Sequence, residues 1–172
     1  VTGAARGIGA TLAKAFAAEG AKVVVTDIAD TQPTVSAINS AGGRALGIKM
    51  DVTNNADIAA MVEAAERTFG PIECLLNNAG MFANIRLKPF WELSEDEWDM
   101  VMRVNVRGGF QVTKGVLPSM RRNGRGKIVN ISSGTVFHGG VGHIQYVSSK
   151  GAVIAMTRSM AMPGMTPSMA VM

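Results

Sequence analysis

The sequence predicts an α/β domain in which helices cover both faces of a doubly wound parallel sheet. Short runs of β-branched residues alternate with longer segments of helical periodicity along the 172 residues. This alternation indicates βαβ units, whose crossover connections make neighbouring strands parallel. In addition, a glycine-rich turn, VTGAARGIG, opens the chain directly before the first helical segment.

The composition predicts one globular domain over residues 1–172 and excludes several classes of protein. Hydrophobic residues make up 47% and charged residues 17% of the chain, which argues against disorder. No apolar run approaches the roughly 20 residues that a membrane helix needs. The net charge of +4 is scattered apart from RRNGRGK at 121–127, which we interpret as a solvated turn, so no nucleic-acid partner is expected. A single cysteine, Cys74, allows no internal disulfide and fits a reducing cytoplasm.

Each strand is predicted from a short apolar or β-branched run. AKVVVTD at 21–27 is typical of a buried parallel strand. The other three predicted strands are RALGIKMDV at 44–52, IECLLNN at 72–78 and GKIVNIS at 126–132.

The first two predicted helices follow from apolar periodicity. Ile8, Leu12 and Phe16 recur at four-residue intervals, and Gly20 is a stop signal. The second helix follows a cap at Asn54 or Asn55.

The last two predicted helices flank the strand at 126–132. SEDEW is a capping-box pattern, with Ser94 and Glu97 three residues apart, and predicts a helix that runs to about Leu117, before Pro118. Another helix is expected from near Gln145 through Met160. Beyond it, residues 162–172 show no clear period and are expected to form an irregular tail.

The opening turn has the composition of a phosphate site. Gly3, Gly7 and Gly9 precede a helix start, where free N–H groups and partial positive charge attract anions. Asp27 follows Gly9 by 18 residues at the end of a strand, where a carboxylate can bind a ribose 2′-hydroxyl and repel a 2′-phosphate. The turn therefore favours NAD over NADP, whereas the alternatives are an ordinary tight turn and a helix-capping Asp27.

A second constellation lies in SSGTVFHGGVGHIQYVSSK at 132–150. Tyr146 and Lys150 are four residues apart, hence on one helix face about 6 Å apart along the axis. A nearby ammonium stabilises a phenolate and lowers a tyrosine pKa toward the working range of a general acid or base. Ser133 could hydrogen-bond a substrate oxygen. The alternative is a half-buried tyrosine beside a solvent-facing lysine. No metal ligands are predicted.

With these motifs in one order, the chain resembles the short-chain dehydrogenase/reductase family, in its shorter subtype. TGAARGIG resembles the family's nucleotide loop, DVTN its adenine-contact stretch and NNAG its fourth-strand signature. VNVRG is similar to the stretch that carries the helix asparagine, IVNISS to the serine strand, and YVSSK to Tyr-x3-Lys. The similarity is nearly collinear from Val1 to about Ala161.

The resemblance implies a Rossmann-like fold and reversible oxidation of an alcohol to a carbonyl. It implies Tyr146 as the acid/base and Lys150 as both a pKa shifter and a contact of the nicotinamide ribose. It implies Ser133, next to Ser132, as the group that orients the carbonyl, and Asn105 as the holder of a water in a proton relay. Without the family, Asn105 would be interpreted as a polar residue satisfied within a helix.

The resemblance also implies the cofactor contacts and the assembly. NAD would contact Gly3, Arg6, Gly7, Ile8, Gly9, Asp27, Asp51, Val52, Asn78, Ala79, Gly80, Tyr146 and Lys150. Family relatives form dimers and tetramers through the helices that correspond to 95–117 and 145–161, so a homodimer or homotetramer is expected. Cys74 corresponds to no family site and is interpreted as a core residue.

The family pattern is incomplete in this chain. Val1 and Thr2 are all that corresponds to the first strand, a central one, and strands six and seven are expected to be absent. We therefore expect a fragment that folds poorly and lacks turnover by itself, because a missing central strand leaves buried backbone groups unpaired.

The expected activity is hydride transfer between NAD(H) and a secondary alcohol or ketone. An apolar or aromatic alcohol and a 3-oxoacyl thioester are both compatible substrates, with Phe82, Phe137, His138 and His143 as candidate contacts. The alternatives are a non-catalytic NAD-binding regulator, an inactive truncated fragment, and a sugar-nucleotide epimerase, whose glycine loop is spaced differently.

Overall fold

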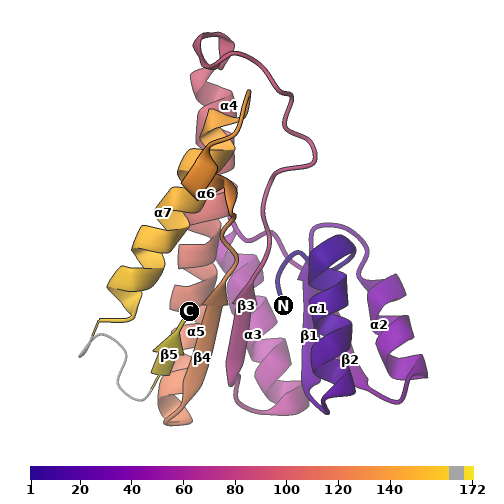
Figure 1. The fold of residues 1–172 in the computed structure, drawn as a ribbon. Helices are drawn as coiled ribbons and strands as arrows, with labels where there is room; N and C mark the ends of the chain where they lie inside the picture. The colour runs from indigo at the N-terminus through magenta and orange to yellow at the C-terminus, as the bar shows by residue number, and fades with distance from the viewer. Residues whose placement is uncertain (163–168) are drawn as a thin grey trace.

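Helices and strands alternate along the chain in the computed structural model, which describes residues 1–162 and 169–172 (Figure 1). The strands are β1 (Lys22–Asp27), β2 (Arg44–Lys49), β3 (Cys74–Asn77), β4 (Gly126–Asn130) and β5 (Met169–Val171). The α-helices are α1 (Gly7–Ala18), α2 (Gln32–Ser40), α3 (Asn55–Phe69), α4 (Glu95–Met102), α5 (Gly109–Arg122), α6 (Thr135–His138) and α7 (Ile144–Met160). A 3₁₀ turn, η1 (Phe90–Glu92), precedes α4, and a π-helical segment, η2 (Arg103–Gly108), joins α4 to α5.

The strands are parallel and form two groups joined by the start of the chain. β1 pairs with β2, and the second group has the order β3-β4-β5. Between the groups, Thr2 forms an isolated parallel bridge with Thr26 of β1 and donates its N–H to the Leu76 carbonyl of β3 at 3.0 Å. The α/β fold with a parallel, Rossmann-like sheet is therefore confirmed, with two residues at the place of a central strand.

Helices cover both faces because successive strand residues point to opposite sides. Val23 and Val25 of β1 belong to a core cluster with Ala13 of α1 and Ile38 of α2. The intervening Val24 packs instead against the larger cluster, which contains residues of α3, α5, β3 and β4. The β1 run AKVVVTD is thus apolar throughout because both of its faces are buried.

The buried face of α1 differs from the predicted one. The residues expected to face the core include Ile8 and Phe16, which are 69% and 38% exposed. The buried face consists of the small residues Gly9, Ala10, Ala13 and Ala17. Close approach of α1 to the sheet favours small side chains, so the larger apolar residues of this helix lie at its margins.

The predicted helix from Ser94 to about Leu117 begins as expected but does not end there. The capping box of Ser94 and Glu97 is present. The helix continues through η2 and past Pro118 to Arg122. The hydroxyl of Ser119 donates to Glu66 of α3 at 2.6 Å and accepts the Ile72 N–H at 3.0 Å, so tertiary contacts extend the helix beyond the proline.

Four elements were not predicted from the sequence, namely α2, β5, the short helix α6 and the 3₁₀ turn η1. Helix α2 begins with Pro33 in its first turn, a position that proline favours, and Gly42 follows it at φ +83°. Strand β5 corrects the expectation of an irregular tail over 162–172, since Met169–Val171 pairs with β4 where a sixth strand was expected to be absent. Residues 163–168, where no clear period was found, lie outside the described part. No helix in the described residues is both long and apolar enough to span a membrane.

Candidate active site

The glycine loop lies between the ends of β1 and β3 and is shaped by its glycines. Gly3 and Gly7 adopt left-handed φ values of +64° and +60°, which favour glycine. A Cβ on Gly3 would lie 2.7 Å from the Ala79 Cα, and one on Gly9 would lie 2.2 Å from the Gly3 carbonyl oxygen. A Cβ on Gly7 would meet nothing within 4 Å, so this part of the loop faces open space.

The first turn of α1 fits a diphosphate. No side chain caps the helix at Arg6, and no acidic residue lies in its first turn. Its free N–H groups and partial positive charge therefore stay available to an anion. Arg6 and Ile8 are both exposed beside the open glycine. The residues present thus fit the phosphates of a dinucleotide, and an alanine at Gly3 or Gly9 would remove the fit.

The NNAG segment supports the glycine loop. The Asn78 amide donates to the carbonyls of Thr2 and Gly3 at 2.9 and 3.0 Å. The hydroxyl of Thr2 accepts the N–H groups of Asn78 and Ala79 at 3.1 and 3.0 Å. Sequence reasoning placed Asn78 on the cofactor and missed Thr2. The signal was the threonine directly before Gly3, whose backbone contacts both groups of strands.

The acidic residue at the end of β1 lies against the same loop. One carboxylate oxygen of Asp27 accepts the Ala5 N–H at 3.0 Å, and the other accepts the Ala29 N–H at 3.0 Å. Each carboxylate oxygen of Asp27 therefore already accepts one hydrogen bond from a backbone N–H group. Asp27 is half-buried, so its carboxylate remains accessible to a ligand.

The predicted adenine contacts separate into one exposed and one buried residue. Asp51 is exposed and accepts hydrogen bonds at 2.8 Å from the N–H and hydroxyl of Thr53. Val52 is 8% exposed and belongs to the larger core cluster. A Cβ on Gly108 would lie 2.6 Å from Val52, so this residue fixes the approach of η2 to the sheet.

Tyr146 and Lys150 lie one turn apart on α7, as their spacing predicts. Tyr146 is half-buried and Lys150 is 6% exposed. The Lys150 ammonium donates to the Ile131 carbonyl at 2.7 Å and lies 5.7 Å from the centre of the Tyr146 ring. Burial lowers the pKa of Lys150. The lysine is therefore a buried cation beside the tyrosine, and the alternative of a solvent-facing lysine is wrong.

The two serines after β4 connect this strand to α7. The Ser132 hydroxyl donates to the Lys150 carbonyl at 2.9 Å. The Ser133 oxygen accepts hydrogen bonds from the N–H and hydroxyl of Thr135 at 3.3 and 2.9 Å. Ser133 is half-buried at the carboxyl end of the strand that leads to the Lys150 partner Ile131, so its hydroxyl lies at the same edge of the sheet as the glycine loop.

Asn105 lies in the π-helical segment η2 and is 5% exposed. Its oxygen accepts the Met81 N–H at 2.6 Å, and its amide donates to the Ser149 hydroxyl at 3.0 Å. Ser149 in turn donates to the Tyr146 carbonyl at 2.7 Å. Sequence reasoning missed Ser149, although YVSSK contains it. Single π turns recur at functional sites, and this one brings Asn105 onto α7.

A cavity of about 10 Å³ lies between Asn105, Lys150 and Asn77. Its volume is close to what one water needs. The Asn77 amide nitrogen is bonded to Thr113 and Asn130 at 2.9 Å each, while its buried oxygen has no partner among the described residues. The cavity thus offers an acceptor, and buried polar groups of this kind are the usual partners of an internal water.

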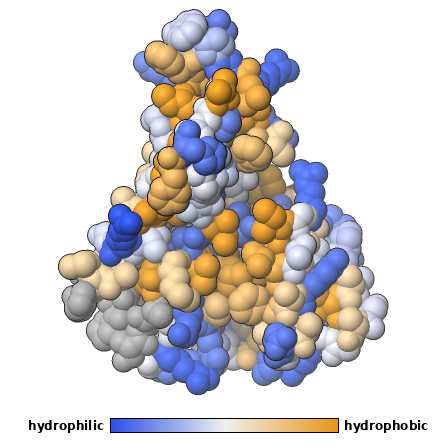
Figure 2. Space-filling model, in the orientation of Figure 1, coloured by the Kyte–Doolittle hydropathy of each residue, from blue (hydrophilic) through white to orange (hydrophobic). Residues whose placement is uncertain are grey.

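Aromatic side chains surround the tyrosine on one side. The Phe82 ring lies 4.7 Å from that of Tyr146, and His143 lies 6.0 Å from both. The other two candidates, Phe137 and His138, make no ring contact with Tyr146 in the described part, and Phe137 is 84% exposed. Figure 2 shows further apolar side chains in the upper part of the molecule, around α4 and α6. No group of three or more His, Cys, Asp or Glu within the described ranges is arranged to hold a metal.

A parallel sheet, a glycine loop before α1 and a tyrosine–lysine pair on one helix are together typical of dinucleotide-binding oxidoreductases. The short chain dehydrogenase family model matches residues 1–172. The chain therefore belongs to the short-chain dehydrogenase/reductase family, and the resemblance found in its motifs is confirmed.

Curated relatives cover nearly the whole chain. The short-chain reductase protein NovJ of Streptomyces niveus is 42% identical over 94% of this chain and 61% of its own length. The (2S)-[(R)-hydroxy(phenyl)methyl]succinyl-CoA dehydrogenase subunit BbsD of Thauera aromatica is 40% identical over 94% of this chain and 64% of its own. The 3-oxoacyl-[acyl-carrier-protein] reductase FabG of Thermotoga maritima is 36% identical over 94% of this chain and 65% of its own length. The chain thus spans less than two thirds of the length of these relatives.

Proposed function

We propose that the protein transfers a hydride between NAD(H) and a secondary alcohol or ketone, with Tyr146 as general acid/base. The observation that supports this most directly is the buried Lys150 ammonium 5.7 Å from the Tyr146 ring, at the same edge of the sheet as the uncapped start of α1. A cation at this position would stabilise negative charge that develops on the phenol oxygen during proton transfer.

The residues of this chain would have separate roles around one reacting carbon. The bound nicotinamide supplies or accepts the hydride. Tyr146 would take the hydroxyl proton during oxidation and return it during reduction, and Ser133 would hold the same oxygen by a hydrogen bond. Lys150 would stabilise the phenolate and hold the nicotinamide ribose, while Asn105 and a water in the cavity behind Lys150 would carry the proton away.

For the cofactor, we infer NAD rather than NADP. The carboxylate of Asp27 lies beside the glycine loop, where it would bind a ribose 2′-hydroxyl and repel a 2′-phosphate. Gly3, Arg6, Gly7, Ile8 and Gly9 would hold the diphosphate. Asp51 and Val52 would meet the adenine, while Asn78, Ala79 and Gly80 would line the remaining part of the site.

For the substrate, we infer an aromatic carbinol. The exposed face of Phe82, 55% accessible and in contact with the Tyr146 ring, would stack on a planar group next to the reacting carbon. BbsD, whose name gives a hydroxy(phenyl)methyl substrate, is 40% identical to the chain. A 3-oxoacyl thioester, as in the name of FabG, is the second candidate, and an aliphatic acyl group would gain less from Phe82.

We also infer the oligomeric state of the protein and its location in the cell. A hollow along α4, η2, α5 and α7 is lined by five apolar residues, Met100, Met102, Val106, Phe110 and Met156, and by four charged ones. A surface that mixes apolar and charged side chains in this way supports a homodimer or homotetramer. The single cysteine of the chain is a free thiol, which supports a cytoplasmic location.

The test compares the unaltered protein with Tyr146→Phe, which removes only the hydroxyl. NADH formation with 1-phenylethanol is followed at 340 nm, and NADH binding is followed by fluorescence titration. The variant should lose about a hundredfold or more of kcat while its Kd for NADH stays unchanged.

A protein that binds NADH with no Tyr146-dependent turnover on aryl, aliphatic or thioester substrates would be either the non-catalytic regulator or the inactive truncated fragment instead. Absence of NADH binding would contradict the proposed cofactor site itself.

A further inference from the structure

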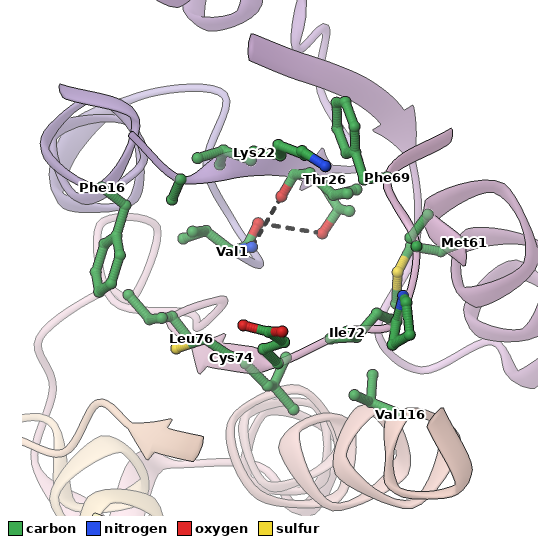
Figure 3. Close-up of a pocket in the computed structure, with 18 of the residues that line it drawn as sticks. Val1, Phe16, Lys22, Thr26, Met61, Phe69, Ile72, Cys74, Leu76 and Val116 are labelled. Atoms are coloured by element: carbon green, nitrogen blue, oxygen red, sulfur yellow. Dashed lines mark hydrogen bonds between the residues drawn. The ribbon is translucent and has the colours of Figure 1, made fainter. Parts of the chain in front are cut away.

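The chain leaves the sheet at the end of β3 and enters an irregular segment. Figure 3 shows Cys74 and Leu76 of this strand, where they line a cavity of about 400 Å³. The strand ends at Asn77, and the chain from 78 to 89 forms no helix or strand. Residues 82–84 of this segment are exposed. Other contacts must therefore hold the segment in place, because packing covers so little of it.

Asn105 holds this segment by the backbone of one residue. Its side-chain oxygen accepts the Met81 N–H at 2.6 Å, and its amide nitrogen donates to the Met81 carbonyl at 3.2 Å. Both backbone groups of Met81 thus pair with one side chain, as they would pair with one residue of an antiparallel strand. Asn105 is 5% exposed, so water competes little for these two hydrogen bonds.

Ser149 holds Asn105 from the side of α7. The Ser149 hydroxyl is fully buried, donates to the Tyr146 carbonyl at 2.7 Å and accepts an amide N–H of Asn105 at 3.0 Å. A carbonyl can only accept, so the hydroxyl proton points to Tyr146 and the hydroxyl oxygen is left to accept from Asn105. The amide must then present its nitrogen to Ser149 and its oxygen to the Met81 N–H. Hydrogen bonds on both sides therefore determine the orientation of Asn105.

These contacts close a ring around the proposed acid/base. Met81 precedes Phe82, whose ring centre lies 4.7 Å from that of Tyr146. On the other side, the backbone of Tyr146 is joined to Met81 by the two hydrogen-bonded side chains. Phe82 is 55% exposed, so burial fixes its position only in part. The hydrogen bonds from α7 therefore determine where the Phe82 ring lies beside Tyr146.

A second arrangement of the same kind on α7 shows what is particular to Ser149. The Thr157 hydroxyl donates to the Val153 carbonyl at 2.7 Å and accepts the Asn130 amide at 2.9 Å. A hydroxyl that bonds to the preceding turn of its own helix is by itself a common local feature. Asn130, however, lies within β4, whereas the partner of Ser149 leads to the segment beside the proposed acid/base. Thr157 is therefore a matched control.

We propose that Ser149 is a positioning residue that gives the site its preference for aromatic substrates. Through Asn105 and Met81 it fixes the Phe82 ring beside Tyr146, where this ring would stack on a planar group next to the reacting carbon. The substrate preference rests on the proposed function, whereas the placement of Phe82 by Ser149 can be measured without turnover.

The first measurement reports the position of Phe82 directly. Tyr146 is the only tyrosine in the sequence, so protein made with isotope-labelled tyrosine gives the NMR signals of this one ring. A neighbouring aromatic ring shifts such signals by its ring current, and Phe82→Ala measures that shift. Ser149→Ala should move the Tyr146 signals in the same direction as Phe82→Ala does, whereas Thr157→Ala should leave them in place. Unchanged Tyr146 signals in Ser149→Ala would overturn the proposal.

The second measurement tests substrate preference by a double-mutant cycle. The ratio of kcat/KM for 1-phenylethanol to that for 2-butanol should fall up to about tenfold in Phe82→Ala and by a similar factor in Ser149→Ala. In the double variant the ratio should fall no further, because both substitutions remove the same contact. Thr157→Ala should keep the ratio of the unaltered protein. Losses that multiply in the double variant would show that Ser149 acts independently of Phe82 and would overturn the proposal.

Asn105→Asp tests the same chain of contacts from its other end. It keeps the shape of the side chain but replaces the donating nitrogen by an oxygen that faces the Met81 carbonyl and the Ser149 oxygen. The Tyr146 signals should shift as in Ser149→Ala, and this variant decides the matter if Ser149→Ala does not fold. Turnover of neither alcohol by the unaltered protein would overturn the proposed function and the substrate preference, while the NMR comparison would still decide whether Ser149 positions Phe82.

Discussion

Asp27 is a residue for which the sequence left two interpretations open, a ribose contact and a local cap. Its two carboxylate oxygens accept the N–H groups of Ala5 and Ala29, which fixes the carboxylate beside the glycine loop. The alternative from the sequence, a local cap after the strand, is present in the contact with Ala29. The ribose contact stays a prediction that this geometry allows, because a carboxylate has room for more than two donors.

Replacing Asp27 by asparagine should change the choice of cofactor. Asparagine keeps an oxygen acceptor but removes the negative charge, and like charges about 4 Å apart repel by about 1 kcal/mol even in water. We expect the affinity for NADPH relative to NADH to rise at least about fivefold, measured by fluorescence titration. Asp30→Asn, on an exposed residue, is the control and should change neither affinity. An unchanged ratio in Asp27→Asn would refute the assignment of NAD.

Replacing Phe82 by alanine tests the proposed aromatic substrate. An aromatic pair contributes about 0.5–1.5 kcal/mol beyond area burial, so kcat/KM for 1-phenylethanol should fall up to about tenfold. The value for an aliphatic alcohol such as 2-butanol should change little. Phe137→Ala is the matched control, since this ring makes no contact with Tyr146 among the described residues. Equal losses on both alcohols would mean that Phe82 supports the site rather than selects the substrate.

At the scale of elements, the start of α4 is the feature that the sequence predicted most directly. Ser94 and Glu97 form the capping box, and Lys88 donates to both oxygens of Glu97 at 2.7 and 2.8 Å. The hydrogen bond from Lys88 and those from Ser94 lower the pKa of Glu97 to about 2. This end of α4 anchors the segment between Phe82 and Ser94, next to the proposed substrate site.

The pH dependence of this helix start follows from that pKa. A carboxyl group with a lower pKa in the folded state contributes stability above its unfolded pKa, about 4.3, and loses that stability as the pH falls toward 2. We expect Glu97→Gln to lower Tm at pH 7, and the difference from the unaltered protein to shrink between pH 4.5 and pH 3. Glu95→Gln, in the same first turn but outside the capping box, is the control. A difference in Tm that stays constant down to pH 3 would show that Glu97 stabilises the fold without its negative charge.

For the whole molecule, the decisive contact is Thr2 between the two groups of strands. Its backbone bonds to Leu76, and its hydroxyl holds the N–H groups of Asn78 and Ala79. Together with Val1, it joins β1 to β3 at the glycine loop. These bonds fix the glycine loop, and with it the proposed cofactor site, against both groups of strands.

Thr2→Val should therefore destabilise the protein by about 1–3 kcal/mol, because it leaves the two partly buried N–H groups of Asn78 and Ala79 without an acceptor. The measurement is urea unfolding followed by circular dichroism. Thr11→Val is the control, since the Thr11 hydroxyl bonds to the Gly7 carbonyl on the surface of α1 and its loss should cost little. Equal effects of the two substitutions would show that Thr2 does not hold the two groups together.

The sequence by itself determined the α/β class, the order of the strands along the chain and the family. These depend on local signals: β-branched runs, glycines that must adopt positive φ, a capping box, and a tyrosine and lysine one helical turn apart. It also predicted the residues of the glycine loop and of the tyrosine–lysine pair, although their roles stay predictions until the variants above are measured.

Only the tertiary structure decided what distant residues do to one another. Small residues of α1 face the core in place of Ile8 and Phe16 because the helix lies close to the sheet. Lys150 is buried because the end of β4 supplies the Ile131 carbonyl, and α5 continues past Pro118 because α3 holds Ser119. Such contacts join residues far apart in sequence, so no local pattern encodes them.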